Sequence, residues 1–368
     1  MDLTGTRMRR AVVERPGLVV VTLLGVLLFL DLVRRVATGQ QGIAQLVGFL
    51  WDGTVIGLVI GLAGIGLSLT YSILNFANFS HGDIVTVGGY VGWATTFAIA
   101  GFGTANFGDL VLLGASGGVS PRSIGVTVTT TPLAVVAGLV VATVAAAAVA
   151  LALDRVVYRP MRDASGISLL IASIGVALAL RYAVVFVWDA SPQGLTAASD
   201  ILSVRIALPG GHFTLGAHQV TLVVMALLLM AGLHLLLQFT KLGTAMRAMA
   251  DNKDLARVTG IPTERVIRLT WIVGGGLAGA AGYLAALERG TIAFNLGWLL
   301  LLLIFAAVIL GGIGSVYGAM VGGLAIGVVS RVSLVWIPAD FGNAAAFLIM
   351  ILILLFRPQG IFGGVETA

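Results

Sequence analysis

The stretch Asn75-Phe-Ala-Asn-Phe-Ser-His-Gly-Asp83 places polar and ionisable side chains between two long apolar segments. Non-helical backbone inside a lipid bilayer is tolerated only where protein buries it or water reaches it, and such breaks can line solute paths. If the flanking segments span a membrane, this stretch is a candidate path lining; a turn at the inner surface fits the composition equally well. The candidate path residues are Asn75, Asn78, Ser80, His81, Gly82 and Asp83.

A second polar segment, residues 241–265, carries a concentration of charge. Residues 244–250 favour a helix, Asn252 or a neighbouring aspartate can cap a second short helix, and Gly260 followed by Pro262 ends it. We interpret the segment as two short helices at the cytoplasmic surface, on which a partner docks. A solvated basic loop is the alternative.

A serine hydrolase motif is present but poorly placed. Ser116 lies in Gly114-Ala-Ser-Gly-Gly118, and a serine nucleophile needs a histidine base within hydrogen-bond reach. Ser116 falls in a glycine-rich outer loop, whereas His234 is predicted near the inner face. An intramembrane serine protease is therefore disfavoured.

The sequence lacks the residue patterns that usually bind nucleotides or metal ions. A phosphate-binding loop needs a lysine directly after glycine, and neither of the two lysines, Lys241 and Lys253, follows one. The chain has no cysteine and no H-E-x-x-H motif, and His212 and His218 stand apart in an outer loop. We expect no catalytic residues, no metal and no cofactor, so any ATP hydrolysis belongs to a partner.

The elements that carry these residues are apolar. Of the 368 residues 58% are hydrophobic and 10% charged, against about 45–50% and about 25% in soluble domains. Since a membrane span needs about 20 apolar residues, we predict an all-α polytopic membrane protein with about ten spans. They are expected at residues 16–37, 48–72, 84–102, 132–153, 167–188, 219–239, 268–287, 296–313, 316–337 and 341–356.

The distribution of basic residues predicts the orientation. A cytoplasmic N-terminus puts most of the 21 lysines and arginines on the inner side, as the positive-inside rule requires. Residues 1–15 and 357–368 are then cytoplasmic tails around a transmembrane domain, 16–356. The basic residues lie between spans, so the bilayer and not nucleic acid is the expected partner. In the outer loops, Ser123–Thr130 and Ile201–Leu208 favour short β-structure.

Several motifs together resemble one family, the permeases of branched-chain amino acid ABC importers. The stretch 75–83 with Gly88-Gly-Tyr90 is similar to the N-F-A-H-G-E and G-A/S-Y signature of the first permease of such pairs. Residues 311–319 and 357–362 also match. The family's ATPase-coupling loop is similar to a spaced set of residues here: Gly243, Arg247, Ala248, Asn252, Ala256 and Gly260.

The resemblance implies a subunit that works by alternating access. Its partners would be a second homologous permease, two cytoplasmic ATPase subunits and an extracytoplasmic solute-binding protein, in the cell membrane of a prokaryote. Arg247 is expected to face an acidic surface of an ATPase. Ser80 stands where the family has alanine and Asp83 where it has glutamate.

Two alternative functions remain open, one with a different substrate and one with a different source of energy. Urea and short-chain amide permeases share nearly the same signature. An ion-coupled secondary transporter would use charged residues at or inside span ends, and Asp52, Asp83, Arg181, Glu288 and Arg331 are placed for that.

Overall fold

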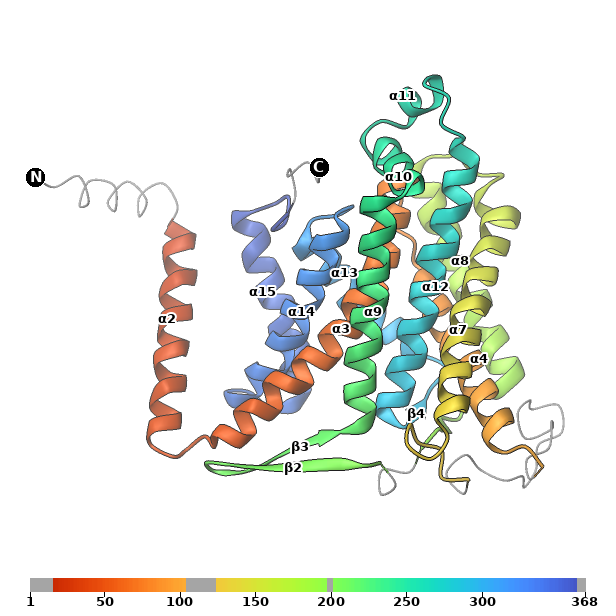
Figure 1. The fold of residues 1–368 in the computed structure, drawn as a ribbon. Helices are drawn as coiled ribbons and strands as arrows, with labels where there is room; N and C mark the ends of the chain where they lie inside the picture. The colour runs from red at the N-terminus through yellow and green to blue at the C-terminus, as the bar shows by residue number, and fades with distance from the viewer. Residues whose placement is uncertain (1–15, 104–123, 197–200, 363–368) are drawn as a thin grey trace, which may run out of the picture.

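The computed structural model describes residues 16–103, 124–196 and 201–362, with the side chains of 16–22 left aside. Ser116, both ends of the chain and most of the first predicted outer loop lie outside the described residues. Figure 1 shows a bundle of long helices with a small projection on one side and short strands on the other.

The helices follow the predicted apolar segments closely. Their bounds are α2 Pro16–Ala37, α3 Ile43–Leu74, α4 Ser80–Ala100, α7 Pro132–Leu153, α8 Gly166–Trp188, α9 Ala217–Phe239, α10 Lys241–Asp251, α11 Lys253–Val258, α12 Thr263–Arg289, α13 Leu296–Gly311, α14 Val316–Val332 and α15 Gly342–Phe356. A π-helical turn, Asp154–Tyr158, extends α7, and two 3-10 turns, Ser333–Val335 and Ala339–Phe341, lie between α14 and α15.

The prediction of about ten spans is wrong in number. Each predicted segment is helical, but within the described residues seven helices are long and apolar enough to cross a membrane. The three others are α2, α4 and α13. Helix α13 has 16 residues, about 24 Å at about 1.5 Å per residue, which is short of a bilayer core of about 30 Å. Helix α4 begins with buried polar residues, and α2 is described with its side chains only from residue 23 onward, which is too short a stretch to count as a span.

Helices α3 and α12 form the centre of the bundle. The membrane-spanning part of α12 is the most enclosed of the seven candidate spans, whereas those of α8 and α15 are the least enclosed. Helix α3 packs along α14 through small residues: a Cβ added at Gly57 would lie 2.9 Å from the Leu324 Cα. Small residues let helix backbones approach closely where lipid provides no hydrophobic drive for association.

Two antiparallel pairs of strands lie on the side of the bundle opposite α10 and α11 (Figure 1). Strand β2 (Ser203–Leu208) pairs with β3 (Gly211–Gly216), and β1 (Gln193–Gly194) pairs with β4 (Thr291–Ile292). The β-structure predicted at 201–208 is confirmed. The prediction at 123–130 is wrong for its described part, 124–130, which forms turns.

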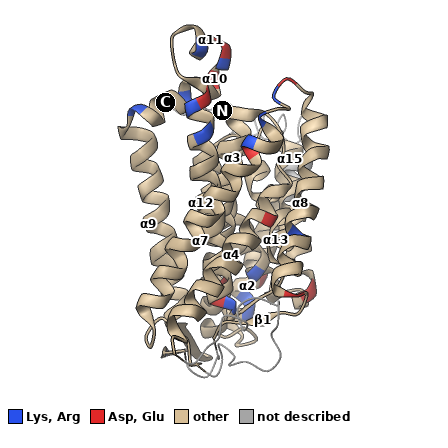
Figure 2. Cartoon of the chain, turned by 90° about the vertical axis from the view of Figure 1, so that its right-hand side faces the viewer, with Lys and Arg blue, Asp and Glu red and all other residues tan. Residues whose placement is uncertain are grey.

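The two ends of the bundle carry most of the charged residues (Figure 2). We call the end that carries α10 and α11 the α10 side, and the end that carries the strands the hairpin side. Charged residues gather mainly at these two ends, with some charge at mid-height beside α13 and α8 (Figure 2). The start of α2 and the end of α15 both lie on the α10 side (Figure 1).

Candidate functional site

The predicted polar stretch interrupts the helices between α3 and α4. Asn75 ends α3 in the left-handed conformation (φ 55°, ψ 36°), and its N–H donates to the Tyr71 carbonyl at 2.8 Å. Asparagine is one of the few non-glycine residues that adopt this backbone readily. The chain then runs without regular structure until α4 begins at Ser80.

This break turns from the surface into the interior. Asn75 is exposed, whereas Asn78, Ser80 and His81 are buried. The His81 Nε2 lies 2.9 Å from the Ala63 carbonyl oxygen, which is 11 residues before the end of α3 and therefore about 16 Å along it. The segment thus begins as a turn at the surface and ends as the first turn of α4, inside the bundle.

A polar network holds the start of α4. The Asn78 Oδ1 accepts hydrogen bonds from the Ser80 Oγ at 2.6 Å and the Tyr158 hydroxyl at 3.2 Å. Tyr158 stacks on Trp271, with ring centroids 5.0 Å apart. Among the described residues, the Asn78 Nδ2 and the Trp271 Nε1 are buried donors without a partner. Unpaired buried donors are uncommon in folded proteins, because each costs the lost hydration of the group.

A buried ion pair joins α4 to α8. The Arg181 Nε and Nη2 donate to the two Asp83 carboxylate oxygens at 3.1 and 3.0 Å. Asp83 is fully buried, and the Arg181 side chain is 13% exposed. The Arg181 guanidinium also lies 4.4 Å from the centre of the Trp298 ring on α13, a cation–π contact. Closer to the α10 side, the Phe79 N–H donates to the Ser173 Oγ of α8 at 3.0 Å.

Helices α4 and α13 cross at two glycines near their starts. A Cβ on Gly82 would come within 2.7 Å of the Gly297 carbonyl oxygen, and a Cβ on Gly297 would overlap the Gly82 carbonyl. The Gly297 N–H donates to the Thr86 Oγ1 at 2.9 Å. The interrupted α4 and the short α13 therefore meet inside the bundle, an arrangement that many transporters use around their solute.

Comparison with known proteins identifies the family. The family described as branched-chain amino acid transport system / permease component matches residues 49–356. The chain belongs to this permease family.

The chain matches LivH and BraD proteins over nearly their whole length. The high-affinity branched-chain amino acid transport system permease protein LivH of Escherichia coli (strain K12) is 30% identical over 327 residues, covering 86% of this chain and 96% of LivH. BraD of Pseudomonas aeruginosa is 29% identical over 328 residues with the same coverage. The probable branched-chain amino acid transport permease protein LivH of Methanocaldococcus jannaschii is 30% identical over 312 residues, covering 82% and 88%. No solved structure matches the chain.

The resemblance predicted from the motifs is confirmed, and so is the role of transport permease. The permease places Asn78, Ser80, His81, Gly82 and Asp83 together, inside its own bundle. That they line a path stays a prediction. Sequence reasoning did not find their partners, Tyr158, Ser173 and Trp298, and weighed Arg181 only as a charge near a span end. These partners lie on other helices, far away in the chain, and no local pattern marks them.

The second predicted element of the permease forms two helices, α10 and α11. The Asn252 side chain caps α11 by accepting from the Leu255 N–H at 2.9 Å, and Gly260 follows in the left-handed region (φ 88°). Ala256 is buried, whereas Ala248 is half-buried. Gly243 lies against the end of α9, where a Cβ would overlap the Leu237 carbonyl.

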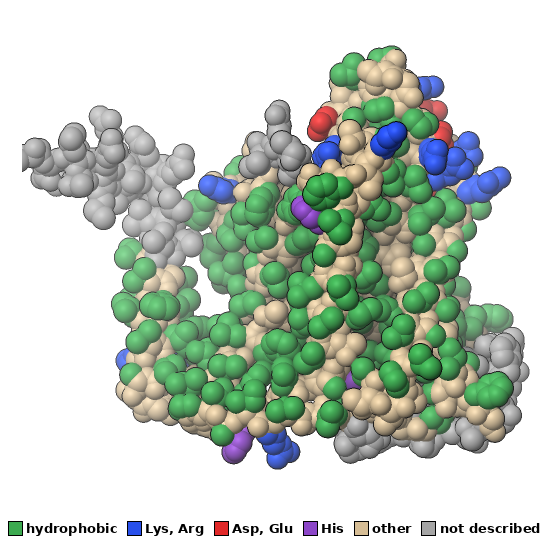
Figure 3. Space-filling model, in the orientation of Figure 1, with side chains coloured by type: hydrophobic (Ala, Val, Ile, Leu, Met, Phe, Trp, Pro, Cys, Tyr) green, Lys and Arg blue, Asp and Glu red, His purple; other side chains and the backbone are tan. Residues whose placement is uncertain are grey.

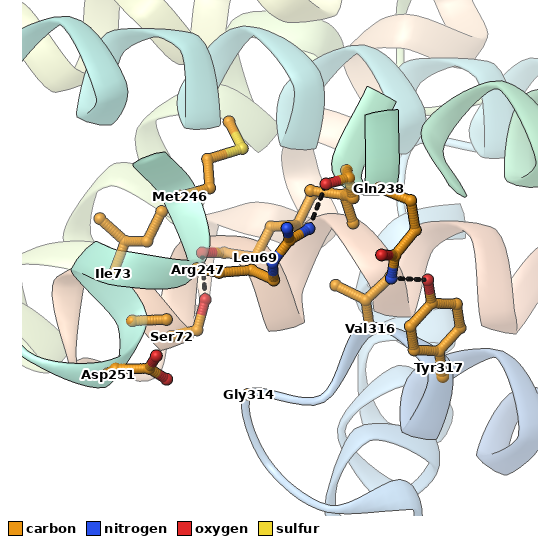
Figure 4. Close-up of a pocket in the computed structure, with 12 residues that line it drawn as sticks. Leu69, Ser72, Ile73, Gln238, Met246, Arg247, Asp251, Gly314, Val316 and Tyr317 are labelled. Carbon is orange, nitrogen blue, oxygen red and sulfur yellow. Dashed lines mark hydrogen bonds between the residues drawn. The ribbon is translucent and has the colours of Figure 1, made fainter. Parts of the chain in front are cut away.

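The permease directs Arg247 inward. Its Nη1 donates to the Leu237 carbonyl at the end of α9, and it lines a small pocket between the ends of α3 and α9, α10 and the chain before α14 (Figure 4). In the same pocket the Gln238 Nε2 donates to the Tyr317 hydroxyl at 3.0 Å. Arg247 therefore joins α10 to the bundle, where an outward contact with a partner was expected.

The outer surface of this projection is partly apolar. Leu255 and Val258 on α11 are 59% and 80% exposed, and charged side chains surround the projection, while apolar side chains cover the sides of the bundle (Figure 3). These exposed apolar side chains lie outside the apolar sides of the bundle, and they suit contact with a protein partner better than contact with water.

Proposed function

We propose that this permease forms, with a second homologous permease, the membrane path through which branched-chain amino acids enter a prokaryotic cell. Two ATPase subunits would bind at the α10 side, in the cytoplasm, and a solute-binding protein at the hairpin side. Both ends of the chain would then be cytoplasmic. The observation that carries the proposal is the end-to-end similarity to LivH and BraD, whose names state this transport.

The coupling mechanism follows from the α10–α11 projection. We infer that residues 241–265 transmit the movement of the ATPase to the bundle, with Gly243, Arg247, Ala248, Asn252, Ala256 and Gly260 shaping the segment. Arg247 and Gly243 both meet the end of α9. A force on α11 would therefore reach α9. Because Arg247 lines the same pocket as the end of α3, the force would also reach the part of α3 that precedes the break. Only a difference in binding between ATP-bound and free states can drive such a change.

The experiment is uptake by the complete complex reconstituted in liposomes, with the binding protein outside and ATP inside. We expect ATP-dependent uptake of leucine, isoleucine and valine. Uptake of urea or acetamide in place of leucine would assign the amide alternative. Leucine uptake that persists without ATP and stops when an ionophore collapses the ion gradient would assign the ion-coupled alternative.

A further inference from the structure

Helix α13 presents an uncovered face although its other face is buried. Leu299 and Leu302 are 56% and 52% exposed, whereas Leu300 and Ile304 are buried. Helix α13 is too short to span a bilayer core, and residues 293–295 and 312–315 at its two ends form turns and irregular structure. Irregular backbone inside a bilayer core is stable only where it is enclosed or faces water.

One edge of this face is aromatic and ends at a cation. Trp298, Leu302 and Phe305 are spaced i, i+4 and i+7 and so share one side of α13. At one end of this stripe the Arg181 guanidinium covers Trp298. At the other end Phe305 contacts Phe79 of the α3–α4 break, with ring centroids 5.0 Å apart. The stripe thus extends from Phe79 to the arginine that pairs with Asp83.

The other edge of the face opens into a polar cavity of about 360 Å³ on the hairpin side. Leu299 and Leu302 form part of its wall, and Arg289, Arg331 and Asn343 contribute polar groups. Among the described residues neither guanidinium makes an ion pair or a hydrogen bond. Glu288 interacts electrostatically with both arginines, so one positive charge remains beside the cavity and favours water and anionic groups there.

Lipid is a poor occupant for such a face. Charged side chains in membrane proteins nearly always face the bundle interior or a water-filled cavity, because exposure to hydrocarbon costs several kcal/mol. Here arginines border the α13 face on both edges. The outer face of α9 offers a contrast: Val224, Leu227 and Leu228 are 48%, 52% and 60% exposed, as expected for contact with acyl chains.

We propose that the exposed face of α13 is the wall of the solute path. This assignment rests on the proposed function and deepens it. The Trp298–Leu302–Phe305 stripe receives the branched apolar side chain of the solute, and the arginine-lined cavity at the hairpin side admits its carboxylate. Asn78, Ser80, His81 and Asp83 then lie behind this wall and hold the start of α4 in position.

The test uses the absence of native cysteine in this chain. The variants L302C on α13 and L227C on α9 have the same exposed fraction, 52%, so any difference in reactivity reports the surroundings. Each is placed in the assembled complex in membranes and treated with the charged thiol reagent methanethiosulfonate ethyltrimethylammonium. Thiols left unmodified are then labelled with polyethylene glycol maleimide in denaturant, and the shift of this subunit is followed on gels.

We expect L302C to react at least tenfold faster than L227C, and leucine-loaded binding protein with ATP to change the L302C rate only. Equal rates for the two variants would overturn the proposal, because the α13 face would then face lipid. Reaction of L302C in the isolated subunit but not in the complex would also overturn it, because the face would be a closed contact between subunits. The difference in rate between L302C and L227C does not depend on which solute moves, whereas absent leucine uptake by the wild-type complex would count against the proposed function alone.

A second variant pair tests transport directly. L302W should lower leucine uptake at least tenfold while the complex assembles and hydrolyses ATP, and the matched L227W should transport like the wild type. Equal uptake by both would contradict the proposed wall.

Discussion

At the scale of single residues, the start of α4 depends on neutralised charge. The Asp83 and Arg181 side chains satisfy each other through two hydrogen bonds in a place where water is scarce. Breaking a buried pair costs about 3–5 kcal/mol because one charge stays behind unpaired, whereas replacing both charges is often nearly neutral. The pair therefore fixes the position of α4 relative to α8 more than it increases the net stability of the fold.

Asp83→Asn alone should destabilise the permease by about 3–5 kcal/mol, since the Arg181 charge is left buried without a counter-charge. The double variant D83N/R181Q should recover most of this loss, because two neutral amides can bond to each other. The thermal unfolding midpoint of the purified protein in detergent, followed by tryptophan fluorescence, measures both. A double variant no more stable than D83N would show that the pair is not the cause.

At the scale of elements, α10 and α11 have different tasks. Helix α10 is fastened to α9 by Arg247 and by the close contact of Gly243. Helix α11 is capped by Asn252 and displays Leu255 and Val258. Charge reversal at Arg247 would therefore disturb the joint to α9 as well as any docking, and the exposed apolar pair is the cleaner probe of a partner.

The double variant L255E/V258E should weaken association with the ATPase subunits at least tenfold, since two carboxylates would have to be desolvated in the contact. Membrane insertion should be unchanged because both side chains are exposed. The matched control is Lys253→Gln, an exposed change on the same helix. Co-purification of the ATPase subunits measures the outcome, and wild-type recovery with L255E/V258E would leave α11 as a solvated connector.

At the scale of the molecule, the two ends of the bundle are chemically distinct. The projection and the helix ends at 16 and 356 occupy one side, and the strands occupy the other (Figure 1). This arrangement brings the start of α2 and the end of α15 to the same side of the bundle (Figure 1). It agrees with the sidedness that the basic residues predict, although the direction in the membrane stays a prediction.

Single cysteines test that direction. An impermeant maleimide added outside intact cells should label H212C in strand β3 and should label N252C only after the membrane is opened. Both sites are exposed, so reagent access is governed by the membrane. Labelling of N252C from outside would reverse the orientation.

The sequence by itself determined the class of protein, the apolar helices, the two short helices of residues 241–258 and the family. These features depend on composition, helix caps and ordered motifs, which are local properties of the chain. Asn252 illustrates this, because the helix cap that it forms depends only on the N–H of Leu255, three residues along the chain.

Only the tertiary structure decided which apolar segments are full spans and where the polar residues point. Arg247 turns inward because the Leu237 carbonyl lies within reach, and Asp83 meets an arginine that is 98 residues away. Helix α13 buries the face that α4 crosses at two glycines and leaves Leu299 and Leu302 exposed. Such contacts depend on how helices pack, and helical periodicity shows which residues share a face but not what that face meets.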